Sequence, residues 1–501
     1  MALPSDYEIV VGLEVHAQLA THSKIFCADA VAFAGRPNTR VSPVSLGHPG
    51  ALPQLNKACV ELAIKMGLAT GCTIAERCHF ARKNYFYPDL PKGYQISQDT
   101  TPICRSGRLT VRYTDRTTGE LTTKTIGITR IHIEEDAGKS LHDQDPFDTL
   151  IDLNRASVGL IEIVSEPDMR SPEEAMAYLT EVRKLVRYLD ICDGNMEEGS
   201  LRCDANVSVR KRGTSQLGTR AEVKNLNSIS NVGRAIAYEA QRQAELLEAG
   251  GTVARETRSF DAATGKTTAM RDKESADDYR YFPEPDLQPL AITPAQLEAL
   301  RAEMPELPEV IYRRFTETYR LPDFDATLLT ESKEMVAFYR SVVEGETGNV
   351  LDYKTAANWV LGPVRTYLND QAVGIEAFPL AGATLHQIAR LVEGGQVSFS
   401  VAKERLFPLA LAHEQAHGPG SADPEAIAQA ENLVLDTDTD ALAAEIGALL
   451  AANPDKVATY LGGKTGLLGF FVGQLMKSTG GKADPKTINT LVAEALEAQR
   501  G

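Results

Sequence analysis

Three short stretches of the chain alternate apolar and polar residues, and each carries an acid on its polar side. The stretches and their polar residues of interest are Tyr7–Leu19 with Glu14 and His16, Leu201–Arg210 with Arg202 and Asp204, and Arg220–Lys224 with Glu222. Side chains of a β-strand point to alternate faces, so this spacing predicts three strands with chemically equipped polar faces.

Glu14, His16, Asp204 and Glu222 would meet on one surface if the three strands paired in one sheet. Carboxylates held that close repel one another unless a divalent cation lies between them. Oxygen ligands with one imidazole suit Mg²⁺ or Mn²⁺ better than a tetrahedral zinc site. The alternative is a solvated sheet face, which shows the same alternation without any metal.

A fourth stretch, Ile131–Lys139, runs from a strand pattern into a dense acidic turn. Alternation divides its acidic and basic side chains between two faces, with His132, Glu134 and Asp136 on one and Glu135 on the other. The upstream Ile126 and Ile128 have the opposite phase, which predicts a bulge near Thr129 or Arg130. Spacing therefore leaves open which acid faces the site, and an exposed acidic turn is the alternative.

Composition indicates an ordinary globular chain with more than one domain. It has 501 residues and a net charge of -16, which argues against non-specific coating of nucleic acid. No apolar run is long enough to span a bilayer, and the N-terminus lacks the pattern of a signal peptide. Seven scattered cysteines without a Cys-x-x-Cys pair predict a reduced, cytoplasmic protein with no membrane partner.

The order of strand and helix patterns predicts an α+β fold. Strand signals dominate the first part, where Pro53–Met66 and Glu173–Leu189 have helical spacing. Ser171 and Pro172 form an N-cap and first helical position for the second of these helices. Helical periodicity dominates afterwards, which predicts domains at residues 1–292, 293–415 and 416–501.

Two segments combine bases with features that suit a nucleic acid. Arg82–Gln95 mixes Lys83 and Lys92 with aromatic rings and prolines, and its prolines predict a loop rather than a strand. Lysines near the C-terminus lie among glycines and could approach a phosphate backbone: Lys464, Lys477 and Lys482. The alternatives are a rigid loop pinned by its own tyrosines and a turn-rich solvated surface.

Taken together, these stretches resemble the B subunit of the tRNA-dependent aspartyl/glutamyl-tRNA amidotransferases. The resemblance covers essentially the whole chain and rests on long ungapped stretches, which are Val11–His16, Arg82–Gln98, Ile131–Lys139, Leu160–Asp168, Glu197–Arg210, Ala221–Ser228, Asp277–Pro283 and Gly466–Lys477.

The resemblance implies an N-terminal, glutamine-synthetase-like antiparallel-sheet cradle that is catalytic, followed by all-helical domains. It implies ATP-dependent phosphorylation of the carboxylate of Glu-tRNA(Gln) or Asp-tRNA(Asn), followed by displacement of phosphate by ammonia. The implied partners are an amidase, which is the A subunit of the complex, the small C subunit, and tRNA(Gln) or tRNA(Asn), with Mg²⁺ or Mn²⁺ as the metal. The heterotrimer is expected to be cytoplasmic.

The resemblance implies a set of metal ligands, and the chemistry of other residues suggests further roles. The implied metal ligands are Glu14, His16, Glu135, Asp204 and Glu222. Lys83, Lys92 and Arg202 are candidates for neutralising phosphate charge in catalysis, and Lys464, Lys477 and Lys482 for binding tRNA. Glu162 is a further catalytic candidate, with pairing inside the sheet as the alternative. No residue is assigned to the adenine ring.

One departure from the family pattern concerns zinc. Many members carry a zinc site built from short cysteine pairs near the N-terminus, but here the matching positions read Cys27-Ala28-Asp29 and Ser42-Pro43-Val44-Ser45. A single thiolate cannot complete such a site, so we expect no structural zinc.

Two other functions compete with the amidotransferase interpretation. A tRNA-binding scaffold would leave all chemistry to its partners, but it would have no need of Glu14, His16 and Glu222 together. A free-standing ligase for a small molecule would have no need of a basic C-terminal helical domain. For the amidotransferase interpretation, the sequence is compatible with Glu-tRNA(Gln), Asp-tRNA(Asn) or both as substrates.

Overall fold

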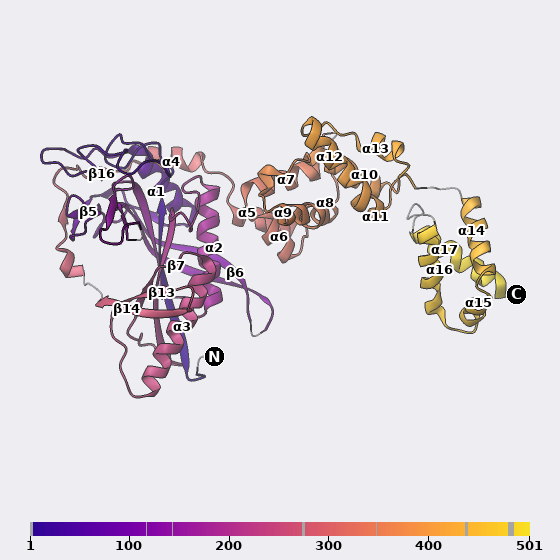
Figure 1. Ribbon diagram of the computed structural model, residues 1–501, viewed down its shortest axis with the longest axis horizontal. Helices are drawn as coiled ribbons and strands as arrows, with labels where there is room; N and C mark the ends of the chain where they lie inside the picture. Colours follow the sequence, from indigo (N-terminus) through magenta and orange to yellow (C-terminus); the bar gives the residue numbers. More distant parts are fainter. Residues whose placement is uncertain are drawn as a thin grey trace. The chain divides into compact units, whose positions relative to one another are not determined.

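The computed structural model describes all residues except 1–3, 117, 143, 273–275, 347, 436–438, 479–484 and 501. The chain divides into two compact units, Met1–Leu307 and Pro308–Gly501 (Figure 1). Within the described residues, no helix has both the length and the apolar character needed to cross a membrane.

The first unit is built on a nine-stranded sheet. Its strands, in spatial order, are β14 (Lys266–Asp272), β13 (Glu256–Asp261), β12 (Ala221–Lys224), β11 (Leu201–Lys211), β1 (Tyr7–Gln18), β10 (Gly159–Ser165), β7 (Leu121–Glu135), β6 (Cys104–Thr114) and β2 (Thr73–Ile74). All neighbouring strands are antiparallel except β12 and β13, which are parallel.

Three helices contribute to the core beneath this sheet, namely α1 (Lys57–Ala69), α2 (Pro172–Tyr188) and α3 (Ile229–Glu248). The odd-numbered residues of β1, such as Val11, Leu13 and Val15, are fully buried in the same core as Leu179 and Val182 of α2. Burying one face of each strand therefore leaves the even-numbered residues of β1 on the opposite face.

The predicted strands and the predicted bulge are confirmed. β1, β11 and β12 match the three alternating stretches to within one residue at each end. In β7 the register against β10 shifts so that Val164 faces Arg130 while Ser165 faces Ile128, which leaves Thr129 as the extra residue. This bulge lets isoleucines on both sides of it reach the core.

The prediction of a loop over Arg82–Gln95 was partly wrong. Two strands, β4 (Ala81–Asn84) and β5 (Tyr94–Ser97), pair as a hairpin around the intervening turn, and β15 (Phe282–Pro283) pairs with β4. Pro88 and Pro91 lie in the turn, so neither removes a donor from the strands. Two further pairs are β3 (Arg77–Cys78) with β16 (Leu290–Ala291) and β8 (Lys139–Leu141) with β9 (Leu150–Asp152).

The two predicted helices are present, with shifted boundaries. The Ser171 hydroxyl accepts a hydrogen bond from the Glu174 amide and caps α2, as predicted. α1 begins four residues later than predicted, at Lys57, because the Asn56 side chain caps it by accepting from the Ala58 amide.

After α4 (Pro294–Ala302), the second unit is helical. Its helices are α5 (Pro308–Arg313), α6 (Asp323–Leu329), α7 (Lys333–Glu344), α8 (Tyr353–Trp359), α9 (Arg365–Gln371), α10 (Gly382–Glu393), α11 (Phe399–Val401), α12 (Phe407–His417), α13 (Pro424–Ala430), α14 (Thr439–Ala451), α15 (Pro454–Leu461), α16 (Leu468–Ser478) and α17 (Pro485–Glu497). Trp359, the only tryptophan of the chain, is buried here against Phe399 and Phe407.

The last four helices share a hydrophobic cluster of their own, which includes Leu442, Phe471 and Val492. The α+β class is confirmed by the largely antiparallel sheet and the helical second unit. The glutamine-synthetase-like architecture and the domain boundaries at residues 292 and 415 stay predictions.

The N-terminal loop that departs from the family's cysteine pattern is held by an aspartate. The Asp29 carboxylate accepts hydrogen bonds from the Ser45 hydroxyl at 2.6 Å and the Cys27 thiol at 3.2 Å. The ammonium group of Lys24, fully buried, lies 3.9 Å from the same carboxylate. Burial raises the pKa of Asp29, but these donors and Lys24 lower it below its usual value overall.

Asp29→Ala should lower the free energy of unfolding by about 1–3 kcal/mol, because it leaves the Ser45 and Cys27 donors without this acceptor and the buried Lys24 charge without its carboxylate partner. Asp370→Ala, at an exposed position of α9, is the control and should change it by less than about 0.5 kcal/mol. Urea unfolding followed by circular dichroism measures both.

The same preparations should contain no stoichiometric zinc by metal analysis. One tightly held zinc ion per chain, or an Asp29→Ala variant as stable as the control, would contradict this account of the loop.

Candidate active site

The predicted site residues come together because their strands are neighbours in the sheet. Antiparallel pairing places His16 of β1 opposite Glu162 of β10, and Glu162 opposite His132 of β7. On the other side of β1, Glu14 lies opposite Asp204 of β11. Directly opposed residues share a face, so one polar surface runs across these strands.

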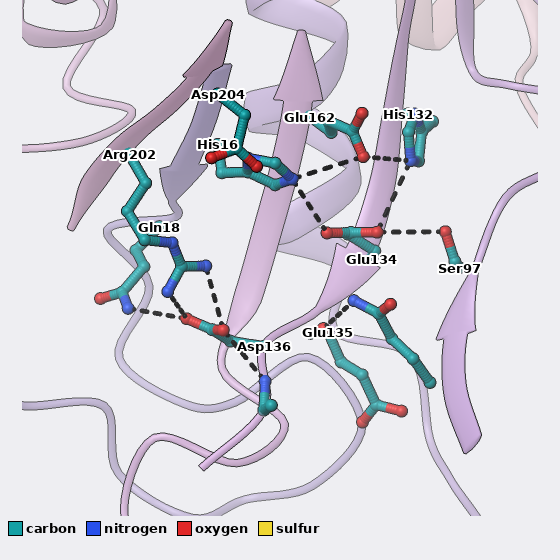
Figure 2. A network of polar contacts seen from close by, with 12 residues as sticks. His16, Gln18, Ser97, His132, Glu134, Glu135, Asp136, Glu162, Arg202 and Asp204 are labelled. Carbon is teal, nitrogen blue, oxygen red and sulfur yellow. Dashed lines mark hydrogen bonds and ion pairs between the residues drawn. The ribbon is translucent and has the colours of Figure 1, made fainter. Parts of the chain in front are cut away.

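The first acidic cluster consists of His16, Glu134 and Glu162, with His132 beside it (Figure 2). The Nε2 atom of His16 lies 3.4 Å from Glu162 and 3.8 Å from Glu134. The Nε2 atom of His132 lies 3.2 Å and 3.6 Å from the same two carboxylates. Two imidazoles thus face two acids, all four contributed by β1, β7 and β10.

The second acidic cluster consists of Glu14, Asp204 and Glu222. The ammonium group of Lys224 donates to Asp204 at 2.6 Å and lies 3.5 Å from Glu222. Asn206 donates to Glu14 at 2.8 Å. Glu14, Asp204 and Glu222 were selected by alternation alone, and the structure brings them within reach of one another.

A third carboxylate group lies where β7 ends. Asp136 accepts two hydrogen bonds from the guanidinium of Arg202, both at 3.0 Å, and a third from Gln18 at 2.9 Å (Figure 2). Burial raises the pKa of Asp136, but Arg202 and Arg155 outweigh it and lower the pKa below its usual value. Arg202, predicted to neutralise phosphate, is therefore already oriented by a carboxylate.

Glu135 and Lys92 do not join these clusters in the structure. The ammonium group of Lys92 donates to both oxygens of the Glu135 carboxylate, at 2.5 and 2.6 Å, and the Ile96 amide donates to one of them. The bulge lies before Ile131, so alternation continues unbroken to Glu135. Glu134 consequently faces His16, and the placement of Glu135 on the metal face is corrected.

Cations and carboxylates line a cavity of about 520 Å³ on this face. Its charged and ionisable lining includes His16, Lys83, Glu134, Asp136, Arg155, Arg202, Asp204 and Lys224. The ammonium group of Lys83 lies 4.8 Å from the centre of the Tyr279 ring and 5.8 Å from that of Tyr85. Lys83, Arg202 and Lys224 thus surround the space beside the acids.

In the first cluster the pKa values of both imidazoles are raised and those of both acids are lowered, which favours the charged forms. Burial lowers the pKa of His132, but Glu162 and Glu134 outweigh it and raise the pKa to about 9. Burial likewise opposes the charged form of His16, whose pKa Glu162, Glu134 and Asp204 raise overall. The pKa of Glu162 is held well below its usual value despite burial, because both histidines face it. A metal ion bound by His16 would displace the proton from its Nε2 atom.

The donor set fits a divalent metal. In each acidic cluster the possible ligand atoms lie within 4.8 Å of one another. Carboxylate oxygens with one imidazole are ligands that Mg²⁺ and Mn²⁺ accept, and a cation would relieve the repulsion between neighbouring carboxylates.

Sequence reasoning missed several members of this surface. His132 and Glu134 were placed on one face by alternation, but the site assignment chose Glu135. Lys224 has the same phase as Glu222 and could have been selected by the same argument. Of the predicted tRNA-binding lysines, Lys464 and Lys477 are exposed, while Lys482 lies outside the described residues.

Comparisons of the sequence with known proteins find one family along most of the chain. Residues 9–298 match the sequence profile of the GatB/GatE catalytic domain, and residues 341–496 match that of the GatB domain. A protein of Syntrophotalea carbinolica is 50% identical over 497 residues, which cover 99% of this chain and 100% of that protein. A protein of Alkalilimnicola ehrlichii is 51% identical over 493 residues, covering 98% and 100%.

Both relatives are named as the B subunit of an aspartyl/glutamyl-tRNA(Asn/Gln) amidotransferase. The matches span both units of the chain and include every strand that supplies an acid to the two clusters. The chain therefore belongs to the family of aspartyl/glutamyl-tRNA(Asn/Gln) amidotransferase B subunits.

Proposed function

We propose that this chain activates the side-chain carboxylate of Glu-tRNA(Gln), Asp-tRNA(Asn) or both with ATP, and converts it to the amide with ammonia from a partner. The γ-phosphoryl group passes to a carboxylate oxygen, which gives an acyl phosphate and ADP. Ammonia then attacks the carbonyl carbon, phosphate leaves with its bonding electrons, and a proton is lost from nitrogen.

The observation that carries this proposal is the pair of acidic clusters beside a cavity lined by cations. Glu14, Asp204 and Glu222 would hold one divalent ion, and His16, Glu134 and Glu162 a second. Bound Mg²⁺ supplies charge neutralisation to phosphoryl transfer. A scaffold without chemistry would gain nothing from gathering these carboxylates, whose repulsion costs stability.

The cations of the cavity have a separate task in this proposal. A carboxylate attacking a phosphate brings two anions together, and Lys83, Arg202 and Lys224 offset their repulsion. Arg202 is held in place by its bidentate contact with Asp136, so its orientation does not have to be acquired during the reaction.

When glutamine is the nitrogen source, a partner subunit has to hydrolyse it and release the ammonia. Burial raises the pKa of the Cys59 thiol to about 12 and that of Cys192 to about 11, so neither is a thiolate nucleophile at neutral pH. Burial also raises the pKa of Cys27. We propose that the partners in a cytoplasmic heterotrimer are the amidase A subunit, which releases ammonia, and the small C subunit.

The C-terminal helices are proposed to bind tRNA away from the reacting end. Lys464 and Lys477 are exposed, and Lys456 lies 3.3 Å from the centre of the Phe470 ring. Contacts between exposed lysines and the phosphate backbone would fix the position of the tRNA without reading its sequence. Identifying the amino acid on tRNA by mass spectrometry after reaction of the assembled complex tests which substrate is used.

Glu14→Gln and Glu222→Gln should each lower amidation by more than about 100-fold, because even outer partners of metal ligands contribute 10–100-fold. Filter binding should show tRNA affinity unchanged. Glu8→Gln is the matched control, since Glu8 lies on the same face of β1 but about 20 Å along the strand, paired with Arg210. Near-normal amidation by both variants at saturating Mg²⁺ would refute the metal assignment.

The isolated chain should form some amide from ammonium, ATP and mischarged tRNA, but none from glutamine. Ammonium supplies the nucleophile directly, whereas glutamine needs a partner's hydrolytic site. Chromatography of the amino acid released from tRNA measures the first reaction, and released glutamate measures the second. Glutamine hydrolysis by the isolated chain would contradict the division of labour.

A double variant, Lys464→Ala with Lys477→Ala, should weaken tRNA binding by the full complex and lower its salt dependence. Each lost phosphate contact reduces the slope of log K against log salt by about 1. Filter-binding titrations at several salt concentrations measure it, with Lys57→Ala of α1 as control. Equal affinities and equal slopes would leave these lysines as a solvated surface.

A further inference from the structure

A hydroxyl group from the neighbouring strand contacts the Glu222 carboxylate of the second acidic cluster. The strand that carries Glu222, β12, runs parallel to β13, and their register places Glu222 beside Thr257. The Thr257 hydroxyl donates a hydrogen bond of 2.9 Å to the Oε2 atom of Glu222. An ionised carboxylate can only accept, so this contact fixes the hydroxyl as the donor.

The contact is shielded from water, because Thr257 and Glu222 are both buried. A hydrogen bond to a charged group is stronger in such surroundings than in water. The other carboxylate oxygen of Glu222, Oε1, lies 3.5 Å from the ammonium group of Lys224. The two oxygens therefore have different neighbours, one a hydroxyl and the other an ammonium group.

These two neighbours differ in how they would respond to a metal ion. Lys224 carries its charge on a flexible stem of four carbons, and a divalent cation entering the cluster would repel it. Thr257 is β-branched, which restricts the rotation of its side chain, and its hydroxyl has no charge. An incoming ion can thus displace Lys224 while the Thr257 hydroxyl stays on Oε2.

A buried network of ion pairs fixes β13 behind this contact. Glu239 of α3 is fully buried, and its carboxylate lies 3.3 Å from the Nε atom of Arg258 on β13. Arg242 donates to both oxygens of Glu239, at 2.6 and 2.9 Å, and the Thr267 hydroxyl donates at 2.8 Å. A buried carboxylate requires such partners, so Glu239 ties the position of β13 to α3.

A bulge lies at the point where β13 makes both contacts. The register of β13 against β14 shifts between Thr257 and Arg258, which leaves Met270 of β14 as the extra residue. Bulges redirect side chains and are common beside active sites. Here the two adjacent residues of β13 are both buried, one against Glu222 and the other against Glu239.

We propose that Thr257 is a positioning residue for metal binding, which holds the Glu222 carboxylate in the orientation that the divalent ion requires. The inference rests on the proposed function, because that ion is the one that Glu14, Asp204 and Glu222 would hold. Groups that hydrogen-bond to metal ligands contribute about 10–100-fold to metal affinity or activity. The alternative is that Thr257 only joins β13 to β12.

Thr257→Val removes the hydroxyl and keeps the branched shape of the side chain. The binding of Mn²⁺ to the full-length chain, without ATP or tRNA, is followed by the EPR signal of the free ion. The dissociation constant of the site that Glu222→Gln weakens should rise about 10-fold or more in Thr257→Val. The Mg²⁺ concentration for half-maximal amidation should rise with it, while KM for mischarged tRNA stays unchanged.

Two further variants separate positioning from a structural role. Thr257→Ser retains a hydroxyl donor and should restore both metal constants to within about threefold of the unaltered chain. Thr268→Val is the matched control, since Thr268 is an exposed threonine of β14, and it should leave Mn²⁺ affinity unchanged. A purely structural role would instead lower the unfolding temperature of Thr257→Val without changing its Mn²⁺ affinity.

The failure of this inference can be told apart from the failure of the proposed function. If Glu222→Gln leaves Mn²⁺ binding unchanged, the metal assignment fails, and the positioning role falls with it. If Glu222→Gln weakens binding but folded Thr257→Val binds Mn²⁺ as tightly as the unaltered chain, the positioning role alone is overturned.

A Thr257→Ser variant that binds Mn²⁺ as weakly as Thr257→Val would overturn the positioning role equally. Thr257→Ala also lacks the hydroxyl and requires less space. It takes the place of Thr257→Val, with the same expected loss of affinity, if circular dichroism shows that Thr257→Val does not fold.

Discussion

The interaction on which the rest of the structure depends is the repulsion among carboxylates gathered on one face of a sheet. The acids of this face are Glu14, Glu134, Asp136, Glu162, Asp204 and Glu222. Each is compensated by a nearby cation or donor, from His16 and His132 in the first cluster to Lys224 in the second and Arg202 at Asp136. Without that compensation, packing the strands this closely would cost several kcal/mol.

Rigidity is what allows the face to carry so much charge. The opposite side of β1 and β11 is fully buried in the core that they share with α2 and α3, and antiparallel pairing sets which residues oppose one another. A shift of one residue in register would move the acids into the core. The hydrophobic core therefore determines the geometry of the polar site as well as the stability of the unit.

Alternation in the sequence was sufficient to predict β1, β11, β12 and four of the acidic-cluster residues, because each lies on a regular strand with one buried face. The bulge at Thr129 was also predictable from the change of phase among the isoleucines. Glu135 was misplaced because the family assignment overruled the phase downstream of that bulge. The β4–β5 hairpin and the Lys92–Glu135 pair depend on where distant segments meet, which no local pattern contains.

Trp359 gives the two units different optical properties. It is the only tryptophan in the chain, and it is buried in the helical unit among Phe399 and Phe407. The intrinsic fluorescence of the chain excited at the red edge of the protein band therefore originates in residues 308–501, while the sheet unit contributes no indole emission. Events in the helical unit can be followed spectroscopically without a label, and a single tryptophan introduced into the sheet unit would report on the other half alone in a Trp359→Phe background.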